Sequence, residues 1–178
     1  MRKNNKTLYL AINALVAAIY AALTMALGFM SYAGIQYRVA EALCVLPFFF
    51  PGTVWGLFIG CVISNLMSPA GPLDMIFGSL ATLGCCLAVA ALGKNKKYTS
   101  WPRCIAACAM PVVFNAIIVG AVLAFTIAEP GMAFGTAYAI FGAQVGFGEL
   151  VVMAVLGLPF IRMLPRSALF KWLSERLS

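Results

Sequence analysis

The chain has 178 residues, of which 63% are hydrophobic and 10% are charged, with 12 Lys and Arg against 5 Asp and Glu. A soluble domain usually carries about a quarter of charged residues. The composition therefore excludes a soluble domain. Because the apolar runs continue from one end to the other, it also excludes a soluble domain with a single anchor. A transmembrane barrel would show short segments of alternating polarity instead. We predict an all-α integral membrane protein with one polytopic domain, residues 1–178.

Apolar segments follow one another along the whole chain. The first is longer than the core of a signal peptide, about 7–15 residues, so we expect it to remain as a span. Turn-forming residues at 68–72, a basic stretch at 93–103 and a break at 129–131 separate the later segments. Residues 165–178 are typical of a short amphipathic interfacial helix. The predicted spans are residues 8–27, 37–50, 52–67, 73–92, 104–127 and 138–162.

The segment 39–66 decides the number of spans. As one kinked helix it gives five spans, and as two short helices that turn between Pro47 and Gly52 it gives six. Short cytoplasmic loops are enriched in Lys and Arg. With six spans and a cytoplasmic N-terminus, every Lys and Arg except Arg38 falls on the cytoplasmic side. With five spans, the loop at Lys94 and the C-terminal basic residues fall on opposite sides. We therefore predict a six-transmembrane-helix bundle with both termini in the cytoplasm.

The same topology gathers the polar residues of the spans at the outer side of the membrane. Ionisable groups in or near the hydrocarbon cost roughly 2.5–3.5 kcal/mol on insertion scales and tend to face a cavity or a partner. Arg38 and Glu41 share a face if their helix starts by Arg38. This pair fits an ion pair that anchors a helix end as well as one wall of a ligand site. The candidate polar site residues are Arg38, Glu41, Asn65, Asp74, Asn115, Gln144 and Glu149.

The sequence lacks the residues that several classes of function require. An intramembrane hydrolase would need a Ser or Cys with a base, paired aspartates or a metal. The chain has no His, and Asp74 is its only Asp. The phosphate-binding pattern GxxxxGK[ST] is absent. The six cysteines form no CxxC pair and are expected to pack as small apolar residues. We expect no catalytic residues, no metal site, no cofactor and no nucleic-acid partner. A self-powered secondary transporter often shows two related halves, and we find no convincing internal repeat in this sequence.

Small residues recur every four positions on three of the predicted spans. Such stripes let helix backbones approach closely. For Gly56, Gly60 and Ser64, and for Gly142 and Gly146, we expect packing inside the bundle. The stripe of alanines on the first span fits internal packing as well as an outward docking face. It consists of Ala14, Ala18, Ala22 and Ala26.

Four blocks of sequence resemble a known family. They are YRVAEAL at residues 37–43, Leu46-Pro47, GLFIGC at 56–61 with Asn65-Leu66 beyond it, and DMIFGSLATL at 74–83. These blocks, and the length and span pattern of the whole chain, resemble the QueT family, which are substrate-binding S components of energy-coupling factor (ECF) transporters.

The resemblance implies a fold, partners and a substrate. It implies six helices and a pocket near the outer surface of the cell membrane. It also implies docking onto a transmembrane T component that carries two cytoplasmic ATPase subunits. On the first helix, Ala14, Ala18 and Ala22 match the docking face of related S components. The implied substrates are queuosine precursors, which are 7-deazaguanine bases such as preQ0, preQ1 or queuine.

The residues of the predicted site suit such a base. A carboxylate can accept hydrogen bonds from the N–H and NH2 groups of a guanine-like edge. We expect Glu41 in this role first, then Glu149 and then Asp74. Asn or Gln can pair with the carbonyl group, and an aromatic residue such as Tyr37 or Phe77 can stack on the ring. Two alternatives are an S component for another vitamin-like substrate and an autonomous, oligomeric small transporter.

Overall fold

The computed structural model describes residues 3–32, 35–94 and 100–177, and within these ranges the chain is helical and contains no strand. Arg2, Lys96 and Lys97, which belong to predicted cytoplasmic segments, lie outside the described residues. The α-helices are α1 (Lys3–Ala26), α2 (Gly28–Ser31), α3 (Val54–Asn65), α4 (Ser79–Gly93), α5 (Trp101–Thr126), α6 (Phe134–Val152), α7 (Leu158–Met163) and α8 (Ala168–Leu177). The 3-10 helices are η1 (Val39–Phe48), η2 (Pro51–Thr53) and η5 (Leu164–Arg166), and the π-helical turns are η3 (Asp74–Gly78) and η4 (Met153–Gly157).

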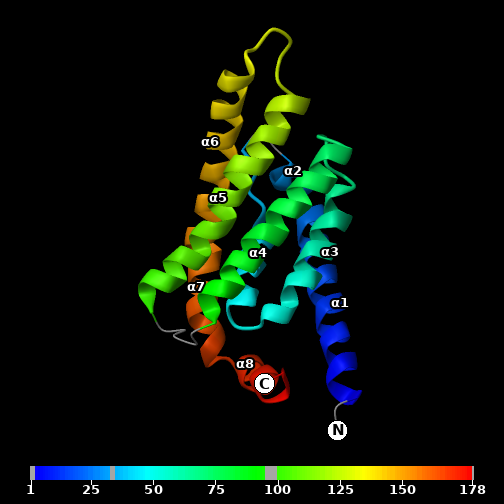
Figure 1. Ribbon diagram of the computed structural model, residues 1–178, viewed down its shortest axis with the longest axis vertical. Helices are drawn as coiled ribbons and strands as arrows, with labels where there is room; N and C mark the ends of the chain where they lie inside the picture. The colour runs from blue at the N-terminus through cyan, green and yellow to red at the C-terminus, as the bar shows by residue number, and fades with distance from the viewer. Residues whose placement is uncertain (1–2, 33–34, 95–99, 178) are drawn as a thin grey trace.

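Four helical segments among the described residues are long and apolar enough to cross a membrane. They are Lys6–Ala26, Asp74–Gly93, Trp101–Thr126 and Phe134–Arg166, and they match the predicted first, fourth, fifth and sixth spans. The long helices run along one another, and the described chain ends lie at the same end of the bundle (Figure 1). The all-helical fold is therefore confirmed, with four helices suited to cross a membrane, and the side of the membrane at which the termini lie stays a prediction.

The segment 39–66 consists of two helical stretches, η1 and then η2 with α3, with a break between them. The 3-10 helix η1 ends at Phe48, and η2 begins at Pro51. Pro47 in the last turn of η1 has no backbone N–H to donate, which disfavours a continued α-helix. At about 2.0 Å per residue for η1 and about 1.5 Å for α3, each piece spans roughly 20 Å. Each is shorter than the hydrocarbon core of about 30 Å, so the count of six spans stays a prediction.

Glycines set the closest helix contacts. A Cβ on Gly56 would lie 2.6 Å from the backbone oxygen of Asn13, and a Cβ on Gly60 would lie 2.8 Å from that of Ala17. A Cβ on Gly120 of α5 would lie 2.6 Å from Cα of Gly142 of α6. These stripes pack α3 against α1 and α6 against α5, as the sequence predicted.

At the end of the bundle that carries the C-terminus, aromatic residues join η1 to the amphipathic tail. The ring of Phe170 in α8 lies 5.4 Å, centroid to centroid, from the rings of Phe49 and Phe50. On the same helix the Arg176 guanidinium lies 4.9 Å from the centre of the Trp172 ring. The predicted interfacial helix is therefore α8, and it is attached to the turn between η1 and η2.

Candidate functional site

The site begins at a local irregularity ahead of α4. The turn η3 is π-helical. Such turns are rare in proteins, and those that occur are often found at functional sites. A Cβ on Gly78 would lie 2.4 Å from Oδ1 of Asp74 and 3.0 Å from Nδ2 of Asn65. Glycine at this position therefore leaves the space in which the side chains of Asp74 and Asn65 meet.

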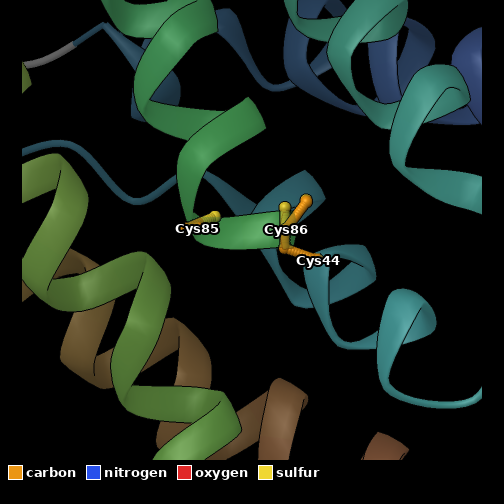
Figure 2. A group of neighbouring side chains, drawn as sticks. All are labelled: Cys44, Cys85 and Cys86. Atoms are coloured by element: carbon orange, nitrogen blue, oxygen red, sulfur yellow. The ribbon is translucent and has the colours of Figure 1, made fainter. Parts of the chain in front are cut away.

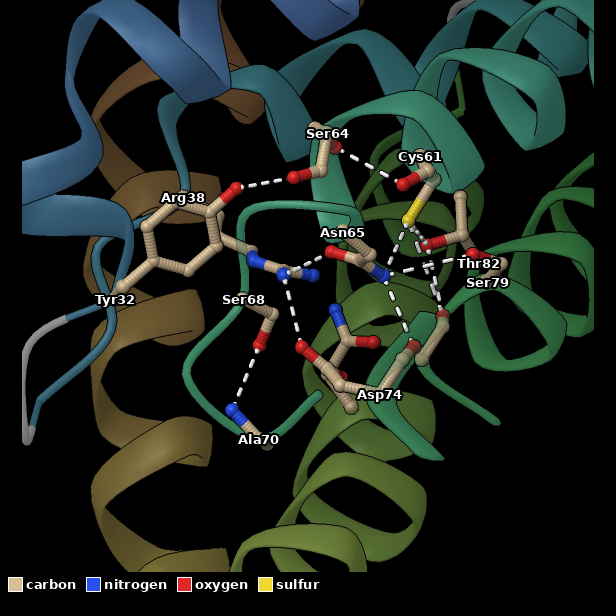
Figure 3. Close-up of polar contacts among 12 residues, drawn as sticks. Tyr32, Arg38, Cys61, Ser64, Asn65, Ser68, Ala70, Asp74, Ser79 and Thr82 are labelled. Carbon is tan, nitrogen blue, oxygen red and sulfur yellow. Dashed lines mark hydrogen bonds and ion pairs between the residues drawn. The ribbon is translucent and has the colours of Figure 1, made fainter. Parts of the chain in front are cut away.

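Arg38 joins this pair from the segment that precedes η1 (Figure 3). Its Nη2 lies 3.5 Å from Oδ2 of Asp74 and also donates a hydrogen bond to Oδ1 of Asn65. Nδ2 of Asn65 donates to the backbone oxygen of Asp74 at 3.1 Å. All three side chains are buried. Three residues from different parts of the chain thus form one interlocked group.

Two aromatic and backbone contacts hold the segment that carries Arg38. The Tyr32 hydroxyl donates to the backbone oxygen of Ser64 at 2.6 Å, and the Arg38 guanidinium lies 5.8 Å from the centre of the Tyr32 ring. Burial raises the pKa of the Tyr32 phenol above its ordinary value, with a contribution from Asp74, while Arg38 lowers it. A Cβ on Gly148 of α6 would lie 2.2 Å from the backbone oxygen of Gln36. The residues just before Arg38 therefore run directly against α6.

Glu41 lies in η1 and has partners on both carboxylate oxygens. Tyr20 and Thr82 donate their hydroxyls to Oε1, the latter at 3.4 Å, and the Cys44 thiol donates to Oε2 at 3.1 Å. Arg38 precedes the first residue of η1 and has a non-helical ψ of 87°, and its backbone oxygen accepts a hydrogen bond from the N–H of Glu41 at 2.9 Å. Of the two interpretations of Arg38 and Glu41, the ion pair between them is wrong, because Arg38 pairs with Asp74.

Cys61 and Thr82 connect Glu41 to the group around Arg38. Thr82 Oγ1 donates to Sγ of Cys61 at 3.2 Å, and Nδ2 of Asn65 lies 3.4 Å from the same sulfur. Figure 3 shows these side chains between α3 and α4. A buried polar network therefore extends from α1, through η1 and α4, to α3.

A second buried polar pair lies between α5 and α6. Nδ2 of Asn115 donates to Oε1 of Glu149 at 3.1 Å, and both side chains are 1% exposed. Pro111 lies inside α5, one turn before Asn115, and the helix continues on both sides of it. Gln144 lies on α6 and is half-buried. Glu149 directly follows the glycine that contacts Gln36, so this pair lies beside the segment that leads to Arg38.

Several buried polar atoms of the site have no hydrogen-bond partner in the described structure. Five of them are acceptor oxygens: Oδ1 and Oδ2 of Asp74, Oδ1 of Asn115, Oε1 of Gln144 and Oε2 of Glu149. Nε of Arg38 and Oγ of Ser31 are also unpaired. A buried donor or acceptor without a partner costs about 1–3 kcal/mol. Acceptors dominate this set, which is the pattern of a site that receives N–H groups.

The predicted aromatic residues have different surroundings. Tyr37 is half-buried, and its backbone N–H donates to the oxygen of Met30 at 3.0 Å. Phe77 is 45% exposed and lines an apolar groove of about 520 Å³ with Leu73, Ile118 and Phe134 among others. Tyr37 is thus the neighbour of Arg38 in the chain, whereas Phe77 faces an apolar groove.

Sequence reasoning missed several residues of the network. Tyr20 lies in the middle of an apolar span, and a buried Tyr hydroxyl usually requires a partner, which was a usable signal. Thr82 and Cys61 carried no such signal, because short polar residues are common in membrane helices. The convergence of Cys44, Cys85 and Cys86 was also missed, since they belong to separate elements (Figure 2).

The fold and the site define a class: an all-helical membrane protein with a buried, acceptor-rich polar network and long apolar helices around it. The sequence model of the family described as QueT transporter matches residues 10–166. The chain therefore belongs to the QueT transporter family, which is a family of transporters and not of enzymes.

One curated relative is the queuosine precursor transporter QueT of Lactococcus lactis subsp. cremoris (strain MG1363). It is 42% identical to this chain over 83 residues, which are 46% of this chain and 48% of the relative. The match thus spans about half the length of that relative. The comparison with solved structures gave no match.

Proposed function

We propose that the protein is the substrate-capturing S component of an ECF-type importer in the cell membrane and binds a 7-deazaguanine queuosine precursor. Membership in the QueT transporter family and the name of the Lactococcus relative support the substrate class. The observation that carries the proposal is the set of five buried acceptor oxygens that accept no hydrogen bond, of which Oδ2 of Asp74 is ion-paired with Arg38.

The chemistry of a deazaguanine complements these acceptors. The base offers N1–H, an exocyclic NH2 group and a pyrrole N–H as donors, and a single carbonyl as its principal acceptor. The carboxylates of Glu149 and Asp74 and the amide oxygens of Asn115 and Gln144 can accept from such donors. Nε of Arg38 is the unpaired nitrogen that can meet the carbonyl. Glu41 already has partners on both oxygens, so we assign the donor-reading role to Glu149 first.

The charge of the site extends the proposal to one kind of precursor. Arg38 is the one cation among the polar site residues, whereas Asp74 and Glu149 are two carboxyl groups with oxygens that accept no hydrogen bond. A ligand that carries an amine, such as preQ1 or queuine, would compensate this excess. The nitrile of preQ0 carries no charge. We infer that preQ1 and queuine bind more tightly than preQ0.

The proposed partners are a transmembrane T component and two cytoplasmic ATPase subunits. All four alanines of the stripe on α1 are exposed, as are Leu10, Leu15 and Ile19 beside them. The opposite side of α1 is the one that packs against Gly56 and Gly60. The stripe is thus free for a close helix contact with another membrane protein, and we assign the docking role to Ala14, Ala18 and Ala22.

A ligand screen tests this function. The detergent-purified protein is heated with deazaguanines, ordinary nucleobases and vitamins in turn. A ligand that binds the folded state alone adds about 2.7 kcal/mol at 100 times its dissociation constant. Stabilisation by preQ1, preQ0 or queuine is expected. Stabilisation by a vitamin and by no deazaguanine would assign the chain to another substrate.

A further inference from the structure

Three buried thiols converge on one point in the middle of the molecule. Cys44 lies in η1, and Cys85 and Cys86 are neighbours in α4. Their sulfur atoms all lie within 4.8 Å of one another, and each residue is 0% exposed (Figure 2). Within residues 3–32, 35–94 and 100–177 this is the one group of three or more His, Cys, Asp or Glu side chains that converges so closely.

The spacing of the sulfurs suits a single metal ion. At a Zn–S distance of about 2.3 Å, two sulfurs of a tetrahedral site lie about 3.8 Å apart. Sulfurs within 4.8 Å of one another reach that spacing through small rotations of their side chains. A packing role requires only a small side chain at each position and gives no reason for three thiols to meet.

An oxygen donor lies next to the thiols. Oε2 of Glu41 is 3.1 Å from Sγ of Cys44, and the other oxygen, Oε1, accepts hydrogen bonds from Tyr20 and Thr82. Hydrogen bonds of this kind orient a metal-ligating carboxylate and disperse its charge. Glu41 Oε2 lies beside Cys44 alone, and a rotation of the Glu41 side chain toward Cys85 and Cys86 would complete a four-coordinate set of three sulfurs and one carboxylate oxygen for Zn²⁺. Thiolate donors also favour Zn²⁺ over Mg²⁺ or Ca²⁺.

We propose that Cys44, Cys85 and Cys86, with Glu41 as the fourth ligand, form a structural Zn²⁺ site that fastens η1 to α4. Binding forms three Zn–S bonds and one Zn–O bond, breaks three S–H bonds and releases the water bound to the free ion. The three protons pass to the solvent, and no atom changes its oxidation state. The reason for such a site lies in η1 itself, because 3-10 helices longer than three or four residues are uncommon and poorly hydrogen-bonded. A metal bridge would hold this ten-residue segment in place.

Titration of the purified full-length chain with Cd²⁺ tests the site. One equivalent of Cd²⁺ is expected to produce a thiolate-to-metal charge-transfer absorption. The variant Cys44→Ala/Cys85→Ala/Cys86→Ala is expected to lose this absorption. The matched control is Cys104→Ala/Cys108→Ala, which removes two other buried cysteines on α5 and is expected to keep it. Absence of the band in the wild-type protein, or its retention in the triple variant, would overturn the proposal.

A second measurement needs no variant and decides the matter if the triple variant does not fold. X-ray absorption at the zinc edge of the wild-type protein, loaded with one equivalent of Zn²⁺, reports the atoms around the ion. Three sulfurs at about 2.3 Å and one oxygen are expected. Any other number of sulfurs would overturn the proposed site.

Discussion

Nη2 of Arg38 lies 3.5 Å from Oδ2 of Asp74, and the two side chains are 2% and 0% exposed. Removal of one partner of such a buried pair leaves an uncompensated charge and costs about 3–5 kcal/mol. Replacement of both by apolar residues of similar volume is often nearly neutral. The stability contributions of the two residues should therefore be coupled.

This relationship gives the first prediction. Arg38→Met and Asp74→Leu should each lower the free energy of unfolding by about 3 kcal/mol or more, because each leaves a buried charge. The double variant should lose less than either single variant. Unfolding in mixed micelles, followed by circular dichroism, measures the three values. Losses that simply add in the double variant would show that the two side chains are not coupled.

The sequence predicted those parts of the fold that follow from length and polarity. The four long apolar helices, the helical break between Pro47 and Gly52, the amphipathic tail helix and the glycine contacts are each set by local composition. The pairing inside the site was not predictable in this way. Whether Arg38 turns to Glu41 or to Asp74 depends on the side chains that other elements bring beside it, namely Asn65 and Asp74.

The candidate site was predictable as a set of residues and not as a geometry. Polar side chains in apolar spans are costly, which singled out Arg38, Glu41, Asp74 and Glu149. Their partners come from helices far apart in the chain, such as Tyr20 for Glu41 and Asn115 for Glu149. Convergence of this kind is a property of the packed bundle, and no periodicity in one segment reports it.

The second prediction concerns the residue that reads the ligand. Glu149→Gln should weaken preQ1 binding by a factor of about 10–150, because a charge-assisted hydrogen bond contributes about 1.5–3 kcal/mol. Glu41→Gln, the matched control, should weaken it less, because Tyr20, Thr82 and Cys44 already contact that carboxylate. Equilibrium binding to the folded variants measures both. The reverse order would return the role to Glu41.

The third prediction concerns docking. Ala18→Trp places a large side chain on an exposed face, so the isolated protein should fold and bind ligand normally. Close approach of a partner helix would be blocked, and co-purification with the T component and ATPases should be lost. Ala91→Trp, at an exposed position on α4, is the control and should still assemble. Assembly of the Ala18→Trp variant would contradict the docking role.

The fourth prediction concerns the orientation in the membrane. Single cysteines are introduced at Pro72, in the turn before η3, and at Lys94, just after α4, since both positions are exposed. A membrane-impermeant maleimide added to intact cells should label Pro72→Cys and not Lys94→Cys. The wild-type chain, whose six cysteines are buried, serves as the blank. Labelling at Lys94 from outside would reject the six-span topology.

The fifth prediction tests the central claim, which is recognition of a cationic deazaguanine by the acceptor-rich site. Isothermal titration calorimetry of the purified protein with preQ1, and then with preQ0, measures it most directly. We predict saturable one-to-one binding of both bases, with a lower dissociation constant for preQ1 because its amine offsets the surplus of carboxyl groups. Tighter binding of preQ0 would contradict the charge argument, and no saturable binding of either base would contradict the proposed function.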